Sequence, residues 1–201
     1  IGFDMDYTLA IYDQEQMDRL TIEAALPKLI ARGYPESLRT LDYELTFPVR
    51  GLMVDAKLGN VLKMDRYKYV KRAYHGMREL SYDERRELYH SMRIRAKGST
   101  RFYFIDTLYA LSEVTLFAAG VSHMEALGMT VDYHEWFYAI RDAVDRSHQD
   151  DSIVSAIVAD PGRFLVRDPQ LPRALHTLRS AGKKLFLITN FSWNLCCFVF
   201  H

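Results

Sequence analysis

Cysteine is scarce in this 201-residue chain, which has only two cysteines, adjacent at Cys196 and Cys197. Neighbouring cysteines rarely bridge each other, and two thiols without spaced partners do not form a zinc site. This usage argues against a secreted domain held together by disulfides and suits a reducing compartment. We therefore expect a cytoplasmic protein.

Long apolar runs and an excess of one charge sign are also missing. No stretch of about 18 apolar residues occurs, so no membrane span is predicted. Lys and Arg number 26 and Asp and Glu number 26, which gives a formal net charge of zero. A balanced chain has no overall attraction to nucleic acid or to an anionic membrane. We expect neither as a partner, and the sequence leaves open whether the chain forms a homo-oligomer.

The sequence does have the periodicity of several helices. Ser81 followed by Glu84 has the form of a capping box, so a helix should begin there. Pro27 should kink or restart the first helix of the chain. The other segments with helical spacing are 15–32, a buried stretch at 105–111, 132–148 and 171–181.

Strand patterns alternate with these helices. Residues 51–55 and 61–65 flank a turn at 58–60 and predict a hairpin. The short apolar run 184–188 follows a helix and Gly182, which predicts a fully buried strand of a parallel sheet. Together these elements predict an α/β fold.

Two carboxylates follow the first strand of this pattern. Asp4 and Asp6 are two residues apart, so both can face one volume beyond the strand's carboxyl end, where open α/β sheets place ligands. A carboxylate can attack phosphorus, although two like charges about 4 Å apart repel by about 4 kcal/mol in a partly desolvated site. Mg²⁺ removes that repulsion, and the second carboxylate can then transfer protons. Alone, the string fits an ordinary acidic loop better, because acidic loops after strands are common.

A second polar pair, Thr189 and Asn190, follows the apolar run near the other end of the chain. A hydroxyl and an amide at a strand's carboxyl end are suitable donors to phosphate oxygens. The alternative is a simple turn, because Asn is common where strands end.

These motifs resemble a known family. The string from Gly2 to Ala10 resembles motif I of the haloacid-dehalogenase-like (HAD) superfamily, in the form found in cytosolic purine 5'-nucleotidases. The likeness continues through residues 33–35, 46–52, 59–60, 101–103 and 140–148, and it ends with 187–190. It therefore covers roughly residues 1 to 190.

The resemblance implies a fold and an activity. The fold would be a Rossmann-like HAD core with a parallel sheet, formed by residues 1–63 and 126–201, with an inserted α+β cap at 64–125. The activity would be Mg²⁺-dependent hydrolysis of purine nucleoside 5'-monophosphates, such as inosine and guanosine monophosphate (IMP and GMP), through an aspartyl-phosphate.

The resemblance also implies roles at the phosphate end of the substrate. Asp4 would be the nucleophile and a ligand of Mg²⁺. Asp6 would be the general acid and base, with its backbone carbonyl on the metal. Thr189 and Asn190 would hold the phosphate.

At the nucleoside end, the resemblance implies contacts with the purine base and the sugar. Arg141, Asp145 and His148 match the family positions that make these contacts, and Tyr109 stands where the family has an aromatic ring against the base. Their spacing of i, i+4 and i+7 puts the first three on one helical face. Without the family, that face fits solvated salt bridges, and Tyr109 fits the core.

The sequence also departs from the family pattern. Phe191 stands where a serine is usual, and residues 192–201 do not resemble the family's continuation. The lysine and the acidic pair that family members carry further on are not found before His201. We therefore expect the chain to be a fragment or a truncated form, without the C-terminal part of the core. The alternatives are a HAD phosphatase for another small phosphomonoester and a non-catalytic nucleotide-binding protein.

Overall fold

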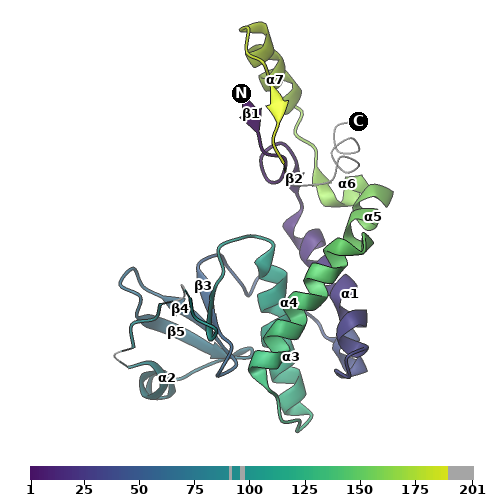
Figure 1. The fold of residues 1–201 in the computed structure, drawn as a ribbon. Coiled ribbons are helices and arrows are strands. Elements are labelled where there is room, and N and C mark those ends of the chain that lie inside the picture. Colours follow the sequence, from purple (N-terminus) through teal and green to yellow (C-terminus); the bar gives the residue numbers. More distant parts are fainter. Residues whose placement is uncertain (91, 96–97, 190–201) are drawn as a thin grey trace. The chain divides into compact units, whose positions relative to one another are not determined.

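The computed structural model describes residues 1–90, 92–95 and 98–189, and Figure 1 shows its helices and strands. The chain divides into two compact units, one of Ile1–Leu20 with Asp151–His201 and one of Thr21–Asp150. The predicted boundaries between core and cap, near residues 63 and 125, both fall inside the second unit. The division into core and cap stays a prediction.

The first unit contains two small sheets and several helices. A parallel sheet joins β1 (Gly2–Phe3) to β9 (Phe186–Leu187), and an antiparallel sheet joins β2 (Ile11–Tyr12) to β8 (Leu165–Val166). The helices of this unit are the start of α1 (Gln14–Ile30), α5 (Ser152–Ala159), α6 (Pro161–Phe164) and α7 (Leu171–Ser180).

Two side chains of the β9 segment lie close over Gly2 of β1. A Cβ atom on Gly2 would lie only 2.5 Å from Ile188 Cδ1 and 2.9 Å from Phe186 Cε2. The prediction of a fully buried strand at 184–188 is wrong, because Phe186 is 56% exposed and Ile188 is 61% exposed. Within the described residues β9 pairs with β1 alone, and α7 has no buried residue, so this helix does not bury the strand.

The second unit is built on a five-stranded antiparallel sheet. Its strand order is β6 (Arg78–Glu79), β5 (Val70–His75), β4 (Asn60–Met64), β3 (Leu52–Asp55) and β7 (Phe102–Phe104). The hairpin predicted around Gly59 is confirmed: β3 pairs with β4 in a register that sets Leu52 opposite Lys63. Gly59 has a φ of +68°, which suits a glycine in this turn.

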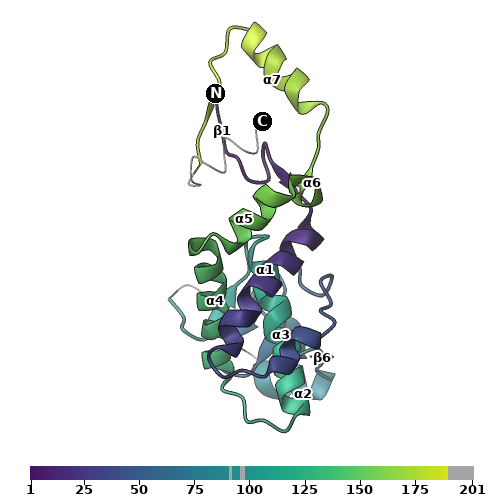
Figure 2. The same ribbon diagram turned by 90° about the vertical axis from the view of Figure 1, so that its right-hand side faces the viewer.

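Helices cover both faces of this sheet. Residues of α1, α3 (Ala110–Ala126) and α4 (Tyr133–Gln149) share one core with Leu52, Val54 and Val61, and Figure 2 shows these three helices side by side. On the other face, Met53 and Leu62 pack with Tyr89 of α2 (Tyr82–Tyr89). A 3-10 helix, Glu36–Thr40, follows α1.

The packing of α3 against α4 centres on Trp136, which is fully buried. Its indole Nε1 donates to the carbonyl of Phe117 at 3.2 Å. A Cβ atom on Gly120 would come within 2.8 Å of Trp136 Cε2. Glycine is therefore needed where α3 meets the indole ring.

Several helix predictions can be compared with the structure. The capping box is confirmed, since the Ser81 side chain accepts from the Glu84 amide and the Glu84 side chain accepts from the Ser81 amide. Helix α1 continues through Pro27 without restarting. The predicted buried helix at 105–111 is wrong over most of its length: residues 105–109 connect β7 to α3, which begins only at Ala110.

The class of the fold is confirmed as α/β, with seven α-helices and both parallel and antiparallel sheets among the described residues. In the same part of the chain, no helix combines the length and the apolar character that a membrane span requires.

Candidate active site

Asp4 directly follows β1, and Thr189 lies two residues after the end of β9, the parallel strand that pairs with β1. Phe3 of β1 lies opposite Leu187 of β9, and the Ile188 amide donates to the Phe3 carbonyl at 2.8 Å. Because the strands are parallel, both residues leave the same edge of the sheet. Asp4 is exposed and Thr189 is partly buried. Asn190, predicted beside Thr189, lies outside the described residues.

The loop after Asp4 is folded around a single carbonyl group. The Met5 carbonyl accepts hydrogen bonds from the amides of Thr8, Leu9 and Ala10 at 3.3, 3.0 and 2.8 Å. The Met5 side chain is fully buried. The Asp4 carboxylate accepts from the Met5 amide at 2.8 Å. Local hydrogen bonds therefore hold the chain as it leaves β1 and fix the place of Asp4 relative to the strand.

Asp6 is oriented by a tyrosine. The Tyr12 hydroxyl, on β2, donates to Asp6 Oδ1 at 2.7 Å, and Asp6 is partly buried while Tyr12 is buried. The residues that the structure describes contain no group of three or more His, Cys, Asp or Glu side chains arranged to hold a metal ion.

A second chain of hydrogen bonds lies beside this pair. The Tyr7 hydroxyl donates to Gln14 Oε1 at 2.8 Å, and Gln14 Nε2 donates to Asp18 Oδ1 at 3.0 Å. Asp18 is 3% exposed, and this burial raises its pKa to about 6. The hydrogen bond from Gln14 acts in the opposite direction and lowers the pKa. Burial, followed by the charges of Asp18 and Asp6, raises the pKa of Tyr7 to about 12.

Sequence reasoning did not identify these supporting residues. Tyr7 and Tyr12 form an edge-to-face aromatic pair with ring centroids 5.3 Å apart. The sequence offered one indication of these contacts: Gln14 and Asp18 are four residues apart on a helix, so their side chains share one face and can contact each other.

The residues predicted for the nucleoside lie in the second unit. Arg141, Asp145 and His148 are all on α4, and Tyr109 immediately precedes α3. Asp145 is exposed, whereas Tyr109 and His148 are partly buried. Burial lowers the pKa of His148, and the charge of Asp145 opposes that effect.

Two neighbours contact the guanidinium of Arg141. Its Nε lies 3.7 Å from Oε2 of Glu113 on α3, and its Cζ lies 5.5 Å from the ring centroid of Tyr103. The Glu113 side chain is 14% exposed. Burial raises the pKa of Glu113 to about 7, with Arg141 acting against this shift and Asp145 adding to it. Sequence reasoning missed Glu113, although it lies one helical turn after Tyr109.

The predicted site residues thus form two groups. Asp4, Asp6 and Thr189 belong to the first unit, and Arg141, Asp145, His148 and Tyr109 belong to the second. Within each unit, the structure brings the members of the group onto neighbouring or shared elements.

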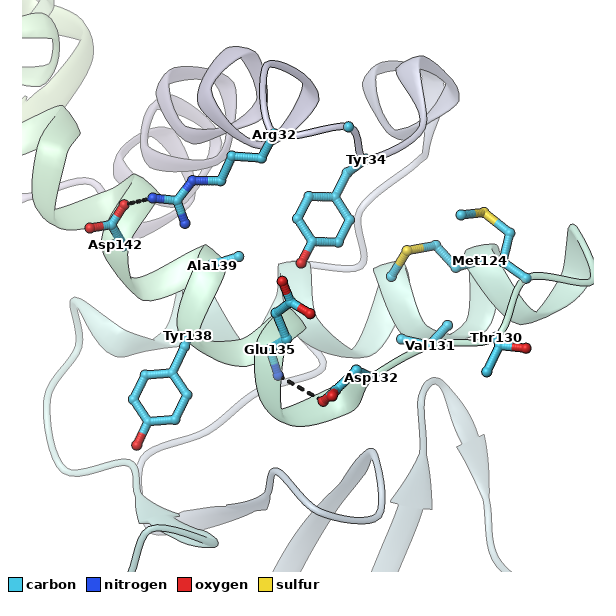
Figure 3. Close-up of a pocket in the computed structure, with 12 residues that line it drawn as sticks. Arg32, Tyr34, Met124, Thr130, Val131, Asp132, Glu135, Tyr138, Ala139 and Asp142 are labelled. Atoms are coloured by element: carbon cyan, nitrogen blue, oxygen red, sulfur yellow. Dashed lines mark hydrogen bonds and ion pairs between the residues drawn. The ribbon is translucent and has the colours of Figure 1, made fainter.

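A separate hollow of about 590 Å³ lies in the second unit, and Figure 3 shows the residues that line it. Among the described residues that line the hollow, Arg32 is the only basic one, and its guanidinium is already paired with the Asp142 carboxylate. In Figure 3 the Glu135 carboxylate points toward Tyr34. Burial raises the pKa of Tyr34, and the charge of Glu135 adds to that effect. The hollow therefore offers little to a phosphate, and it contains none of the predicted site residues.

Comparisons with known proteins agree with the motifs. A model of the 5' nucleotidase family matches residues 1–200. A 5'-nucleotidase domain-containing protein of Dictyostelium discoideum is 31% identical over 96% of the chain and 33% of its own length. The 5'-nucleotidase domain-containing protein 2 of Rattus norvegicus is 30% identical over 94% of the chain and 36% of its own length. The chain spans about a third of the length of these relatives. The match over nearly the whole chain confirms the predicted resemblance, and the chain belongs to the 5' nucleotidase family.

Proposed function

We propose that the protein hydrolyses purine nucleoside 5'-monophosphates, with IMP and GMP as substrates and Asp4 as the nucleophile. The parallel pairing of β1 with β9 is the observation that carries this proposal, because it sets Asp4 and Thr189 at neighbouring strand ends. Membership of the 5' nucleotidase family supports the same chemistry. We place the protein in the cytoplasm, since its adjacent thiols suit a reducing compartment.

The reaction has two displacement steps at phosphorus. In the first, a carboxylate oxygen of Asp4 forms a bond to phosphorus, and the ester bond to the nucleoside oxygen breaks. Asp6 gives its proton to that leaving oxygen. In the second, a water molecule attacks the phosphoryl group and gives a proton to Asp6, so inorganic phosphate leaves and the Asp4 carboxylate is restored.

The supporting residues orient these groups. The Tyr12 hydroxyl holds Oδ1 of Asp6, which fixes the direction of its carboxyl group for proton transfer. Thr189, with Asn190, would donate hydrogen bonds to the phosphoryl oxygens. Donors placed before the reaction need no reorganisation as charge develops on those oxygens.

The donor set fits Mg²⁺. The Asp4 carboxylate and the Asp6 backbone carbonyl are hard oxygen donors, and Mg²⁺ is usually held by one or two carboxylates, waters and substrate phosphate. When bound, the ion would offset the repulsion between the anionic nucleophile and the phosphate, which is about 4 kcal/mol at 4 Å in a partly desolvated site.

At the nucleoside end, we propose that Arg141, Asp145 and His148 contact the base and the sugar and that Tyr109 lies against the base. Their arrangement supports this proposal, because α4 carries the first three on one face and the Arg141 guanidinium is held over Tyr103.

The test is phosphate release from IMP, with and without Mg²⁺. We expect the unmodified protein to release phosphate only with Mg²⁺, and the Asp4→Asn variant to release none. Asp13→Asn is the matched control, because Asp13 is an exposed aspartate that accepts from the Gln16 amide, a role that Asn can also fill. Phosphate release that persists in Asp4→Asn would refute the assignment of the nucleophile.

A further inference from the structure

Another hollow of the second unit is basic. It has a volume of about 310 Å³ and lies between α2 and the first residues of β5, which pack against each other (Figure 1). We call it the α2–β5 hollow. Its basic lining residues are Lys71, Arg85, Arg86 and His90, and no Asp or Glu is among the described residues that line it. An anion that entered it would meet three fixed positive charges, from the lysine and the two arginines.

Helix α2 separates its charges between two sides. Four of its residues line the hollow with the spacing i, i+3, i+4 and i+7, which is one helical face: Tyr82, Arg85, Arg86 and Tyr89. Its three acidic residues fall outside that face: Asp83, Glu84 and Glu87. The hollow therefore keeps a positive charge although α2 as a whole carries both signs.

These cations are only weakly engaged within the chain. The Lys71 ammonium lies 3.4 Å from an oxygen of Asp65, and the lysine side chain is 63% exposed, so this pair contributes little. Arg85 donates to the backbone carbonyl of Lys71 and lies 5.4 Å from the ring centroid of Tyr82. Among the described residues, Arg86 has no ion pair. The charges are thus available to a ligand.

Tyrosine rings are concentrated at the same place. Three of the four exposed tyrosines of the described chain lie in or beside the hollow: Tyr67, Tyr69 and Tyr82 are 56%, 43% and 63% exposed. A tyrosine ring offers a flat apolar face, and unpaired nucleic-acid bases stack on such faces.

The basic surface continues past the hollow. The turn before β5 exposes Arg66, Tyr67 and Lys68. The Lys68 carbonyl accepts from the Ile94 amide at 3.2 Å, so residues 92–95 lie against this turn. Ile94 is buried, and the exposed residues on either side of it are both arginines. Cations and rings therefore cover a longer path than one small anion occupies.

We propose that this surface binds single-stranded nucleic acid, with a phosphate in the α2–β5 hollow and unpaired bases stacked on Tyr69 and Tyr82. A duplex hides the faces of its bases, an acidic peptide lacks the rings, and a free mononucleotide fills the hollow alone. The zero net charge of the chain predicts no nucleic-acid partner, but it averages over all residues and takes no account of where the charges lie.

The test is a fluorescence anisotropy titration of a labelled oligoadenylate, whose 5' end carries a hydroxyl group so that the proposed hydrolysis cannot consume it. With three or more phosphates neutralised, the logarithm of the affinity should fall with the logarithm of the salt concentration at a slope of about −2 or steeper. The affinity should therefore drop roughly 20-fold or more between about 50 and 200 mM salt.

Two substitutions separate charge from stacking. Arg86→Gln should make the slope shallower by about 0.7, whereas the control Arg173→Gln, an exposed arginine of α7, should leave it unchanged. Tyr82→Ala should weaken binding about tenfold, and Tyr82→Phe should preserve it, because Phe keeps the ring face.

Four outcomes would overturn the inference. The first is the absence of binding by the folded chain, and the second is an equal affinity for a duplex of the same length. The third is unchanged binding in folded Arg86→Gln and Tyr82→Ala variants. The fourth is equally effective competition by polyglutamate or by free mononucleotide, which would assign the surface to an acidic protein or to a small anion. None of these outcomes depends on phosphate release, so the proposed function is tested separately.

Discussion

Replacing Asp55 by Asn should destabilise the second unit strongly, whereas replacing Glu79 by Gln should not. Both carboxylates accept two hydrogen bonds from an arginine. Arg101 donates to Asp55 at 2.7 and 2.6 Å, and Arg72 donates to Glu79 at 2.8 and 2.6 Å. The difference between them is burial: the Asp55 side chain is 0% exposed and that of Glu79 is 43% exposed.

The size of the expected destabilisation follows from the hydrogen bonds that Asp55 accepts. Besides Arg101, it accepts from the Tyr89 hydroxyl at 2.8 Å, and that hydroxyl accepts from the Asn60 side chain at 2.8 Å. Removing one partner of a buried ion pair costs about 3–5 kcal/mol. Asn keeps one acceptor oxygen and the Arg101 side chain is 27% exposed, so we expect the lower end, about 3 kcal/mol. The exposed pair is screened by solvent and should contribute little.

The assay is urea unfolding followed by the fluorescence of the buried Trp136, in a Trp193→Phe background. With a slope of about 1–3 kcal/mol per molar urea, Asp55→Asn should lower the unfolding midpoint by roughly 1–3 M. The Glu79→Gln midpoint should stay close to that of the parent. Equal shifts for the two variants would refute the argument that burial decides the contribution of these ion pairs.

Three further results are expected. Gly120→Ala should lower stability by about 1–3 kcal/mol in thermal unfolding, because its Cβ would overlap the ring of Trp136. Tyr12→Phe should lower kcat for IMP about tenfold with little change in KM, since it removes the hydroxyl that orients Asp6; a change in KM alone would contradict this role. Burial raises the pKa of Glu113 from 4.5 to about 7, so the folded chain binds the carboxyl proton more tightly than the unfolded chain does. The protonated carboxyl group therefore contributes stability below about pH 4.5, and this contribution is lost as the pH rises to about 7. Glu113→Gln should therefore show a flatter dependence of the urea midpoint on pH between 5 and 8, and an unaltered dependence would refute the shift.

Elements set by local interactions could be predicted from the sequence. The capping box of Ser81 and Glu84 is formed by residues three positions apart, and the structure confirms both of its hydrogen bonds. The hairpin around Gly59 is similarly local, because a turn of fixed length also fixes the register of its strands. The positions of Asp4 and Thr189 after two apolar runs can likewise be read locally, and their roles in the site stay predictions.

Elements set by distant partners could not be predicted. The aromatic segment Phe102–Phe104 forms a strand by pairing with the distant β3, and the apolar pattern of 105–111 alone did not show that a helix begins only at Ala110. The exposure of Phe186 likewise depends on which elements cover β9. Glu113 and Arg141 are 28 positions apart, so only the packing of α3 on α4 reveals their contact.

The most direct test of the central claim is to trap the phosphoryl group on Asp4. The protein would be mixed with IMP and Mg²⁺, quenched with acid within one turnover, digested and examined by peptide mass spectrometry. We predict one added phosphoryl group on the peptide that contains Asp4, and none in the Asp4→Asn variant. Release of phosphate with no phosphoryl group on that peptide at any time point would contradict nucleophilic catalysis by Asp4.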